Sequence, residues 1–232
     1  MSDKNLLSPA YALVAAIGAV LIAPAAGAGQ ELRVGLQAAA GSWDEDLSTA
    51  VPGIEDQTLS ADGGGVGVVA QYVVKSDADT GFFIGFEGAI TQQDASDTTT
   101  VTLPPLFSAD VTGEIVNSVD LLWFGGYDFG MVSAYAGIGP TIAGGEGEIA
   151  FAGTTLKDEA THIGWKYGAG VEVDLGSNVS VIARASYAGY RNRAYTAEGF
   201  PIAVDVEPRV NEIRVGVVYR VNVADVLGAV GL

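Results

Sequence analysis

The sequence contains no cysteine and a single histidine, His162. A chain without cysteine forms no disulfide, so backbone hydrogen bonds and side-chain packing must hold its fold together. Basic residues are also scarce, with 11 Lys and Arg against 28 Asp and Glu and a formal net charge of -17. Such an acidic surface repels nucleic acid, so no nucleic-acid partner is expected. After residue 28 no apolar stretch is long enough to cross a bilayer as a helix.

A predicted signal peptide begins the chain. Residues 11–23 are apolar apart from Gly18, Lys4 precedes them, and residues 26–28 read Ala-Gly-Ala, the small-x-small pattern of a signal peptidase site. Residues 1–28 are therefore expected to be cleaved during export. An uncleaved membrane anchor is the alternative, because residues 11–28 approach the roughly 18 apolar residues at which a spanning helix becomes possible. About 200 residues remain, enough for one domain.

Eight segments between residues 30 and 221 alternate apolar and polar residues with the period of a β-strand. In the first, Leu32, Val34 and Leu36 share one face, while Arg33 and Gln37 share the other. Asn117 falls on the apolar parity of the fourth segment, which a bulge or an early exit from a membrane would explain. The segments lie at about residues 31–38, 65–75, 81–92, 117–123, 132–138, 165–175, 179–187 and 213–221.

The connections between these segments alternate in length. Residues 76–80, 128–130 and 176–178 are short and rich in turn-forming residues, whereas residues 44–64, 94–111, 145–162 and 191–208 are long. An even strand number with this rhythm is typical of outer-membrane barrels. Residues 29–221 are therefore predicted to form an all-β, eight-stranded antiparallel up-and-down transmembrane β-barrel with its turns in the periplasm and its loops outside. Residues 222–232 form an apolar C-terminal extension.

A soluble exported lipocalin-like barrel that binds an apolar ligand would also have eight strands with alternating faces. Here the polar face carries charges of both signs, which ion pairs inside a lumen shielded from lipid would explain. Aromatic residues near strand ends, such as Trp43, Trp123 and Trp165, favour the membrane alternative because such rings prefer the membrane–water boundary. The predicted lumen ion-pair network consists of Arg33, Glu87, Asp120, Lys166, Glu172, Arg184 and Arg214.

Three parts of the sequence carry a family resemblance. Residues 167–187 form a hairpin with Gly-Ser-Asn at its turn, residues 134–140 read AYAGIGP, and the last strand contains Arg214-x-Gly216-x-x-Tyr219-x-Val221. These segments resemble the OmpA/opacity-type small outer-membrane barrels, and the last resembles the signal read by the barrel-assembly machinery. Val221 departs from the pattern, because family members usually end this signal with an aromatic residue. The resemblance implies an integral protein of the Gram-negative outer membrane, with membrane lipid, lipopolysaccharide and the assembly machinery as partners and no cofactor.

The long connections hold 16 acidic and 3 basic residues. Solubility explains such a surface, and binding of divalent cations or basic partners is the alternative. Asp44, Glu45 and Asp46 are the candidate calcium ligands, since hard cations take clustered carboxylate oxygens, although their spacing lacks the pattern of a known calcium loop.

Catalysis and transport are both disfavoured by the sequence. Catalysis at the outer rim generally needs a base beside a nucleophile, and His162 at the predicted edge of the third loop is expected to be a solvated boundary residue. Eight strands enclose a lumen that side chains fill, so no continuous aqueous pore is expected. The predicted function is a non-enzymatic outer-membrane barrel with a structural, surface-exposed role, and a narrow porin-like channel for ions or small solutes is the alternative.

Overall fold

The computed structural model describes residues 29–49, 57–76, 80–103, 107–151, 154–196 and 203–222. The predicted signal peptide and residues 223–232 of the predicted extension lie outside this range. No helix among the described residues is long and apolar enough to span a bilayer. The strands are β1 (Gln30–Thr49), β2 (Gln57–Lys75), β3 (Gly81–Leu103), β4 (Phe107–Asp128), β5 (Val132–Phe151), β6 (Thr154–Asp174), β7 (Val179–Tyr190), β8 (Arg193–Thr196) and β9 (Ala203–Asn222).

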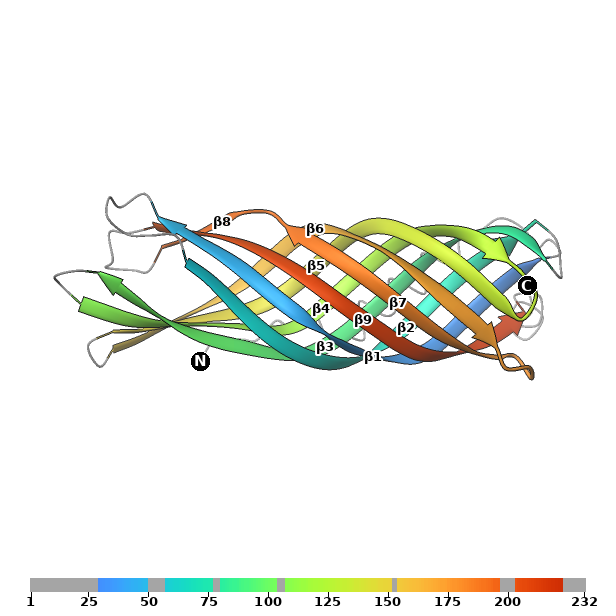
Figure 1. Ribbon diagram of the computed structural model, residues 1–232, viewed down its shortest axis with the longest axis horizontal. Helices are drawn as coiled ribbons and strands as arrows, with labels where there is room; N and C mark the ends of the chain where they lie inside the picture. Colours follow the sequence, from blue (N-terminus) through green and yellow to red (C-terminus); the bar gives the residue numbers. More distant parts are fainter. Residues whose placement is uncertain are drawn as a thin grey trace, which may run out of the picture.

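The strands close into one antiparallel barrel (Figure 1). Each strand from β1 to β7 pairs with its neighbours in sequence, β7 pairs with β9, and β9 pairs with β1. The short β8 pairs only with residues 203–206 of β9 and follows β7 in the same position of the wall, which therefore has eight strands. The β7 ladder ends where Gly189 meets Arg209, next to Pro208, which has no N–H to donate. The predicted all-β, eight-stranded closed barrel is confirmed.

Tight turns join the strands at one end of the barrel. In the β6–β7 turn Gly176, Ser177 and Asn178 all have positive φ angles, of 79°, 53° and 65°. Glycine adopts this conformation without strain and asparagine tolerates it well. In the β4–β5 turn the Asp128 carboxylate accepts a hydrogen bond from the N–H of Gly130 at 2.9 Å. The turns predicted at residues 128–130 and 176–178 are thus confirmed, whereas residues 77–79 of the third lie outside the described range.

The predicted apolar faces form the outer surface of the barrel. Leu36 and Phe82, for example, are 70% and 72% exposed. On β4 the outward run reaches from Tyr127 to Val119, close to the roughly 9–11 residues with which a tilted strand crosses a bilayer. A register shift between Ile115 and Asn117 ends this run, so the bulge inferred from the parity of Asn117 is present.

Beyond this band the wall divides into two sheets at the end opposite the tight turns. The β2–β3 ladder ends at Gly64 and Asp94, and the β6–β7 ladder ends at Gly164 and Tyr190. We call β2, β1, β9 and β8 beyond this level the first protruding sheet, and β3 to β6 the second protruding sheet. They separate at the left end of Figure 1.

The prediction of long loops at this end is wrong, because most of those residues are strands. β1 continues to Thr49, β3 to Leu103 and β5 to Phe151. Both faces of a strand outside a membrane can meet water, so such strands need no apolar alternation. Threonine, abundant in β3, still favours the extended backbone.

The two protruding sheets touch at one side. Leu47, Leu59 and Val206 of the first sheet form a small buried cluster against which Val111 of the second sheet packs. The N–H of Ser60 also donates a hydrogen bond to the Asp97 carboxylate at 3.3 Å. The sheets are therefore joined along the β2–β3 side.

Candidate functional site

The barrel interior holds the main concentration of charged side chains. Every second residue of a strand faces the interior, and the residues between them face outward. The polar residues of the strands occupy the inward positions. Arg33, Glu87 and Arg214 are 2%, 0% and 1% exposed. Burial of this kind requires each charge to have partners, because an unpaired buried ion is costly.

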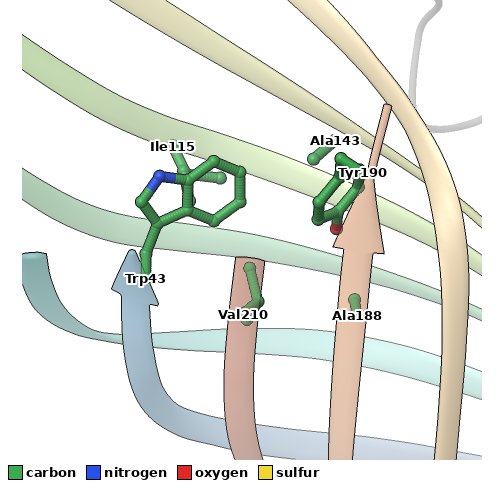
Figure 2. Packing of buried hydrophobic residues seen from close by; sticks show 6 residues of the cluster. All are labelled: Trp43, Ile115, Ala143, Ala188, Tyr190 and Val210. Atoms are coloured by element: carbon green, nitrogen blue, oxygen red, sulfur yellow. The ribbon is translucent and has the colours of Figure 1, made fainter. Parts of the chain in front are cut away.

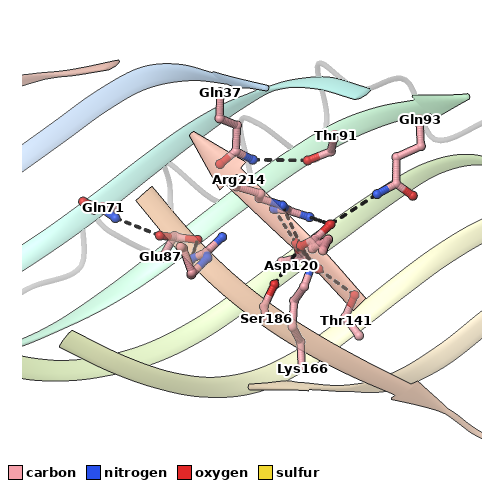
Figure 3. Close-up of polar contacts among 12 residues, drawn as sticks. Gln37, Gln71, Glu87, Thr91, Gln93, Asp120, Thr141, Lys166, Ser186 and Arg214 are labelled. Atoms are coloured by element: carbon pink, nitrogen blue, oxygen red, sulfur yellow. Dashed lines mark hydrogen bonds and ion pairs between the residues drawn. The ribbon is translucent and has the colours of Figure 1, made fainter. Parts of the chain in front are cut away.

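A four-charge cluster occupies the middle of the lumen (Figure 3). Asp120 on β4 forms ion pairs with Lys166 on β6 at 2.8 Å and with Arg214 on β9 at 2.7 Å. Thr141 donates a hydrogen bond to the other Asp120 oxygen at 2.6 Å. Glu212 pairs with both cations, and its distance to the Arg214 Nε is 2.7 Å. Two carboxylates and two cations thus neutralise one another across the barrel.

Glu212 has two further neutral partners. It accepts hydrogen bonds from Ser186 at 3.0 Å and from Gln93 at 3.4 Å. These contacts bring β3 and β7 into the same network as β4, β6 and β9 (Figure 3). The cluster therefore ties together strands that lie on different sides of the barrel.

A second group of charges lies nearer the tight turns. Glu87 pairs with Arg184 and accepts a hydrogen bond from Gln71 at 2.7 Å. Arg33 pairs with Glu172 and, at 2.8 Å, with Glu31. The Glu87–Arg184 and Arg33–Glu172 pairs join residues 97 and 139 positions apart in the sequence, so these two pairs form only in the closed barrel.

The tight-turn end of the lumen is closed by further ion pairs. Lys75 pairs with Asp128 at 2.8 Å and with Glu31 at 3.1 Å. Arg220 pairs with Asp174. Ion pairs therefore occupy the lumen from its middle to its rim at the tight turns.

All seven residues of the predicted lumen network lie in the interior and take part in these ion pairs. Sequence reasoning missed Glu212, Lys75 and Asp128. Glu212 stands just before the predicted start of the last strand, two residues before the inward-facing Arg214. Extending the alternation by one residue would have predicted that Glu212 also faces the lumen. Lys75 and Asp128 stand at strand ends, where the inward side is not evident from alternation.

Figure 2 shows a layer of buried apolar residues, which lies next to the charged cluster on the side of the protruding sheets. Trp43, Ile115, Ala143, Ala188, Tyr190 and Val210 form it, and they come from β1, β4, β5, β7 and β9. The rings of Trp43 and Tyr190 lie 5.5 Å apart between centroids. His162 packs edge-on against both rings, at 6.3 Å from each centroid.

Two expectations are corrected here. His162 is not a solvated boundary residue, because it is only 3% exposed and lies between two aromatic rings. Trp43 does not lie on the outer surface, whereas Trp123 and Trp165 are exposed there. Both errors have one cause. The alternation of inward and outward residues continues beyond the predicted membrane segments of β1 and β6, and it places Trp43 and His162 inside.

A small cavity lies near the charged cluster, and a larger groove lies on the outer wall of the barrel. A cavity lined by Trp43, Gln93 and Glu212 has a volume of about 20 Å³, room for about one water molecule. A groove of about 740 Å³ lies on the outer wall, lined by Ile84, Trp123 and Ile138 among others. The larger hollow therefore belongs to the apolar exterior and lies away from the charged interior.

The candidate calcium ligands do not converge. Asp44 accepts a hydrogen bond from Ser60, and Asp46 accepts one from Thr58 at 3.1 Å and pairs with Arg209 at 3.1 Å. Glu45 has the opposite parity, and burial raises the pKa of its carboxyl, an effect partly offset by a hydrogen bond from Trp43. No group of three potential metal ligands occurs anywhere in the described residues.

The proposed assembly-signal residues occupy alternating environments on β9. Arg214 is buried in the central cluster, and Gly216 packs against the β1 backbone, where a Cβ would lie 2.7 Å from the Leu36 carbonyl oxygen. Tyr219 is exposed on the outer wall, and Val221 pairs with Leu32 of β1. The segment thus contributes to both barrel closure and the lumen network.

The charged groups of the interior are paired with one another. Its carboxylates are neutralised by guanidinium and ammonium groups, and the aromatic layer separates them from the protruding sheets. A solute on the barrel axis would have to break several buried ion pairs to pass.

A comparison with protein families agrees with this architecture. The model of the outer membrane protein beta-barrel domain family matches residues 12–220. Among solved structures, Ail, the attachment invasion locus protein of Yersinia pestis, is 15% identical, with 82% of this chain and 98% of that chain covered and a TM-score of 0.37. Neisserial surface protein A is 16% identical, with 81% and 96% covered and a TM-score of 0.41.

OprG from Pseudomonas aeruginosa is 13% identical, with 84% of this chain and 97% of that chain covered and a TM-score of 0.42. No curated protein matches the sequence. The family model covers most of the chain, from residue 12 to residue 220. The chain belongs to the outer membrane protein beta-barrel domain family.

Proposed function

We propose that this protein is a non-conducting, non-catalytic barrel that spans the outer membrane and holds two acidic protruding sheets outside the cell. Its role is structural: it stabilises the membrane and presents a rigid surface. The observation that carries the proposal is the blocked interior, where Asp120, Lys166, Arg214 and Glu212 form a buried cluster beneath the layer around Trp43.

The exterior supports the membrane-spanning part of the proposal. Apolar side chains such as Leu36, Phe82 and Ile213 are exposed all around the wall, and charged side chains are turned inward. A soluble lipocalin-like barrel requires the reverse arrangement, with an apolar interior. In lipid the closed wall leaves no unpaired strand edge within the band, which is the condition for a spanning sheet.

The orientation and partners form part of the proposal. Cleavage after residue 28 delivers the chain to the periplasm, and the barrel-assembly machinery reads Arg214, Gly216, Tyr219 and Val221 before the last strand pairs with β1. Membrane lipid and lipopolysaccharide surround the finished barrel. Divalent cations held by lipopolysaccharide are attracted to the acidic protruding sheets as a diffuse layer.

A narrow channel for ions or small solutes is the competing function. Its requirement is a water-filled path along the barrel axis. The buried ion pairs and the packed rings of Trp43, Tyr190 and His162 oppose such a path. We therefore favour the structural role.

The test combines two readouts on the purified full-length protein. After refolding into liposomes, the protein should resist carbonate extraction and migrate differently on gels before and after heating. The same liposomes should not swell in isotonic solutions of small sugars. Release by carbonate would refute membrane insertion, and rapid swelling would refute the blocked interior.

A further inference from the structure

The groove on the outer wall crosses strands β2 to β5. Its volume of about 740 Å³ lies in the range of roughly 300–1,000 Å³ that is usual for small-molecule sites. The side chains that line it are apolar apart from the hydroxyl of Tyr72 and the indole N–H of Trp123. The size and the chemistry of the groove therefore suit one apolar ligand.

Small residues form the floor of this groove. Gly125 on β4 is in register with Ile84 on β3 and with Ala136 on β5. Trp123 and Tyr127 stand two positions before and after Gly125 on the same strand, so all three share the outward face. The hollow at Gly125 therefore lies between two aromatic side chains.

Aromatic pairs form the two sides of the groove. On the side away from the tight turns, Tyr72, Phe86 and Trp123 are in register on three neighbouring strands. The rings of Phe86 and Trp123 meet edge-on, with centroids 6.0 Å apart. On the side of the tight turns, the rings of Phe82 and Tyr127 are nearly perpendicular, with centroids 5.0 Å apart. Edge-to-face contacts of this kind are stabilising, so they fix the positions of the two sides.

Strand packing does not require a glycine at residue 125. A Cβ there would lie 3.5 Å from the carbonyl oxygen of Phe83, which is an ordinary van der Waals contact. At Gly35 and Gly139, by contrast, a Cβ would lie 2.1 Å and 1.9 Å from a carbonyl oxygen of a neighbouring strand. The open floor is thus a feature of the outer surface. An unfilled gap deprives its lining of dispersion contacts, so a ligand that fills it gains them.

The position of the groove identifies its occupant. Phe82, Ile84 and Ile138 beside it are 72%, 68% and 52% exposed and belong to the apolar outer face of the wall. The groove is continuous with this lipid-facing band, so acyl chains are the molecules next to it. A second barrel would present a convex wall that rests on the aromatic sides, whereas one hydrocarbon chain is thin enough to reach Gly125.

The length and depth of the groove fit one leaflet of a bilayer. From β2 to β5 the groove crosses three strand spacings of about 4.8 Å, or roughly 14 Å. Half of the hydrocarbon core of a bilayer is roughly 15 Å thick. Trp123 is five residues from the end of β4 at the tight turns, a depth of about 13 Å for a strand tilted by roughly 40°. The groove therefore lies in the half of the bilayer next to the tight turns.

We propose that this groove binds one acyl chain of a phospholipid from the leaflet next to the tight turns, with Gly125 and Ala136 beneath the chain. The rings of Phe86, Trp123 and Tyr127 contact the chain from both sides. The inference rests on the proposed function only in that the barrel spans a membrane, and in the proposed orientation the leaflet is the periplasmic one.

The experiment uses tryptophan fluorescence, because Trp123 lines the groove. The chain has three tryptophans, of which Trp43 is buried in the apolar layer. Trp165→Phe removes the other exposed tryptophan, and Trp123 then reports on the outer wall alone. The probe is phosphatidylcholine with dibrominated acyl chains, which quench indole fluorescence on contact. It is added to the full-length protein in detergent micelles, with the same lipid without bromine as the reference.

Two variants in this background fill the groove, and a matched variant fills another part of the wall. Gly125→Phe and Ala136→Phe place a ring in the groove from β4 and from β5. Ala185→Phe adds the same ring to the exposed outward face of β7. A shift of gel mobility on heating confirms that each variant is folded.

Quenching of Trp123 should saturate near one lipid per barrel. We expect Gly125→Phe and Ala136→Phe to bind the lipid at least about tenfold more weakly, because the ring and the chain cannot occupy the same space. Ala185→Phe should bind within about twofold of the protein that carries Trp165→Phe alone.

Three results would overturn the inference. Quenching that rises in proportion to the lipid without saturation would mean general contact with the wall. Unchanged binding in Gly125→Phe and Ala136→Phe would place the lipid outside the groove. Equal losses in all three variants would mean a general effect of an added ring. Carbonate extraction and liposome swelling report separately on the proposed function, because a barrel can insert and stay blocked without a bound chain.

Discussion

Removal of Asp120 is the sharpest perturbation of the lumen. Asp120 is fully buried and is the shared anion of Lys166 and Arg214. Asp120→Asn keeps the shape of the side chain but leaves both cations with Glu212 as their remaining carboxylate in the cluster. The four-charge cluster then changes from neutral to one net positive charge inside the wall.

The magnitude follows from burial. Breaking a buried ion pair by removing one partner typically costs about 3–5 kcal/mol, because the remaining charge stays desolvated. Asp120→Asn should fall in this range. Glu148→Gln breaks the exposed pair with Lys157 and should cost less than about 1 kcal/mol.

The assay is urea unfolding of protein folded in zwitterionic vesicles, followed by tryptophan fluorescence and by gel mobility. A second variant, Asp120→Asn/Lys166→Met, restores neutrality and should recover most of the lost stability, because apolar replacement of buried pairs is often neutral. A loss below about 1 kcal/mol for Asp120→Asn, or a double variant less stable than the single one, would refute the reasoning.

Trp43→Ala should cost about 3–5 kcal/mol in the same assay, because the ring fills the buried layer beside Tyr190, and a loss below about 1 kcal/mol would contradict that packing. Burial raises the pKa of Glu45, so its folded state binds a proton more readily than the unfolded chain. The free energies of hydrogen exchange at residues 42–47 should rise as the pH falls from 7 toward 4.5, the ordinary pKa of the group, and should not change with pH in Glu45→Gln. The same pH dependence in the wild type and in Glu45→Gln would contradict a raised pKa at Glu45. Chelation of divalent cations should leave the unfolding temperature of the protein in neutral-lipid vesicles unchanged, because Asp44 and Asp46 already bond to neighbouring side chains, and a fall of several degrees would indicate a bound ion.

Alternation was sufficient to predict the strands inside the membrane band. Leu32 and Arg33 take opposite sides of the wall, and the same rule sends Asp120 and Lys166 into the lumen. The rule works because lipid and lumen are unlike environments, so each face selects its own residue type. The bulge at Asn117 could be predicted for the same reason, because Asn117 interrupts the alternation.

The sequence did not predict which charged residues pair with one another. Arg33 meets Glu172 because barrel closure brings β1 and β6 across the lumen from each other, and no local pattern encodes that distance. Register depends on all eight ladders together. Sequence reasoning could therefore name the members of the network but could not assign its pairs.

The strands beyond the band were missed for a physical reason. Thr98 and Thr100 on β3 and Thr112 on β4 are polar residues on a water-facing surface, so they show no contrast between faces. A hydrogen bond between the hydroxyls of Thr98 and Thr112 at 2.8 Å helps to fix the hairpin. Their β-propensity was the available signal, but it also suits an extended loop.

The central claim is that the interior is blocked, and current through a planar lipid bilayer measures it most directly. Purified full-length protein, inserted and confirmed as folded by its gel mobility, should give no steady current in molar salt at moderate voltage. The charged cluster at Asp120 and the layer at Trp43 would each have to open for ions to pass. A steady, reproducible single-channel conductance from the wild-type protein would contradict the account.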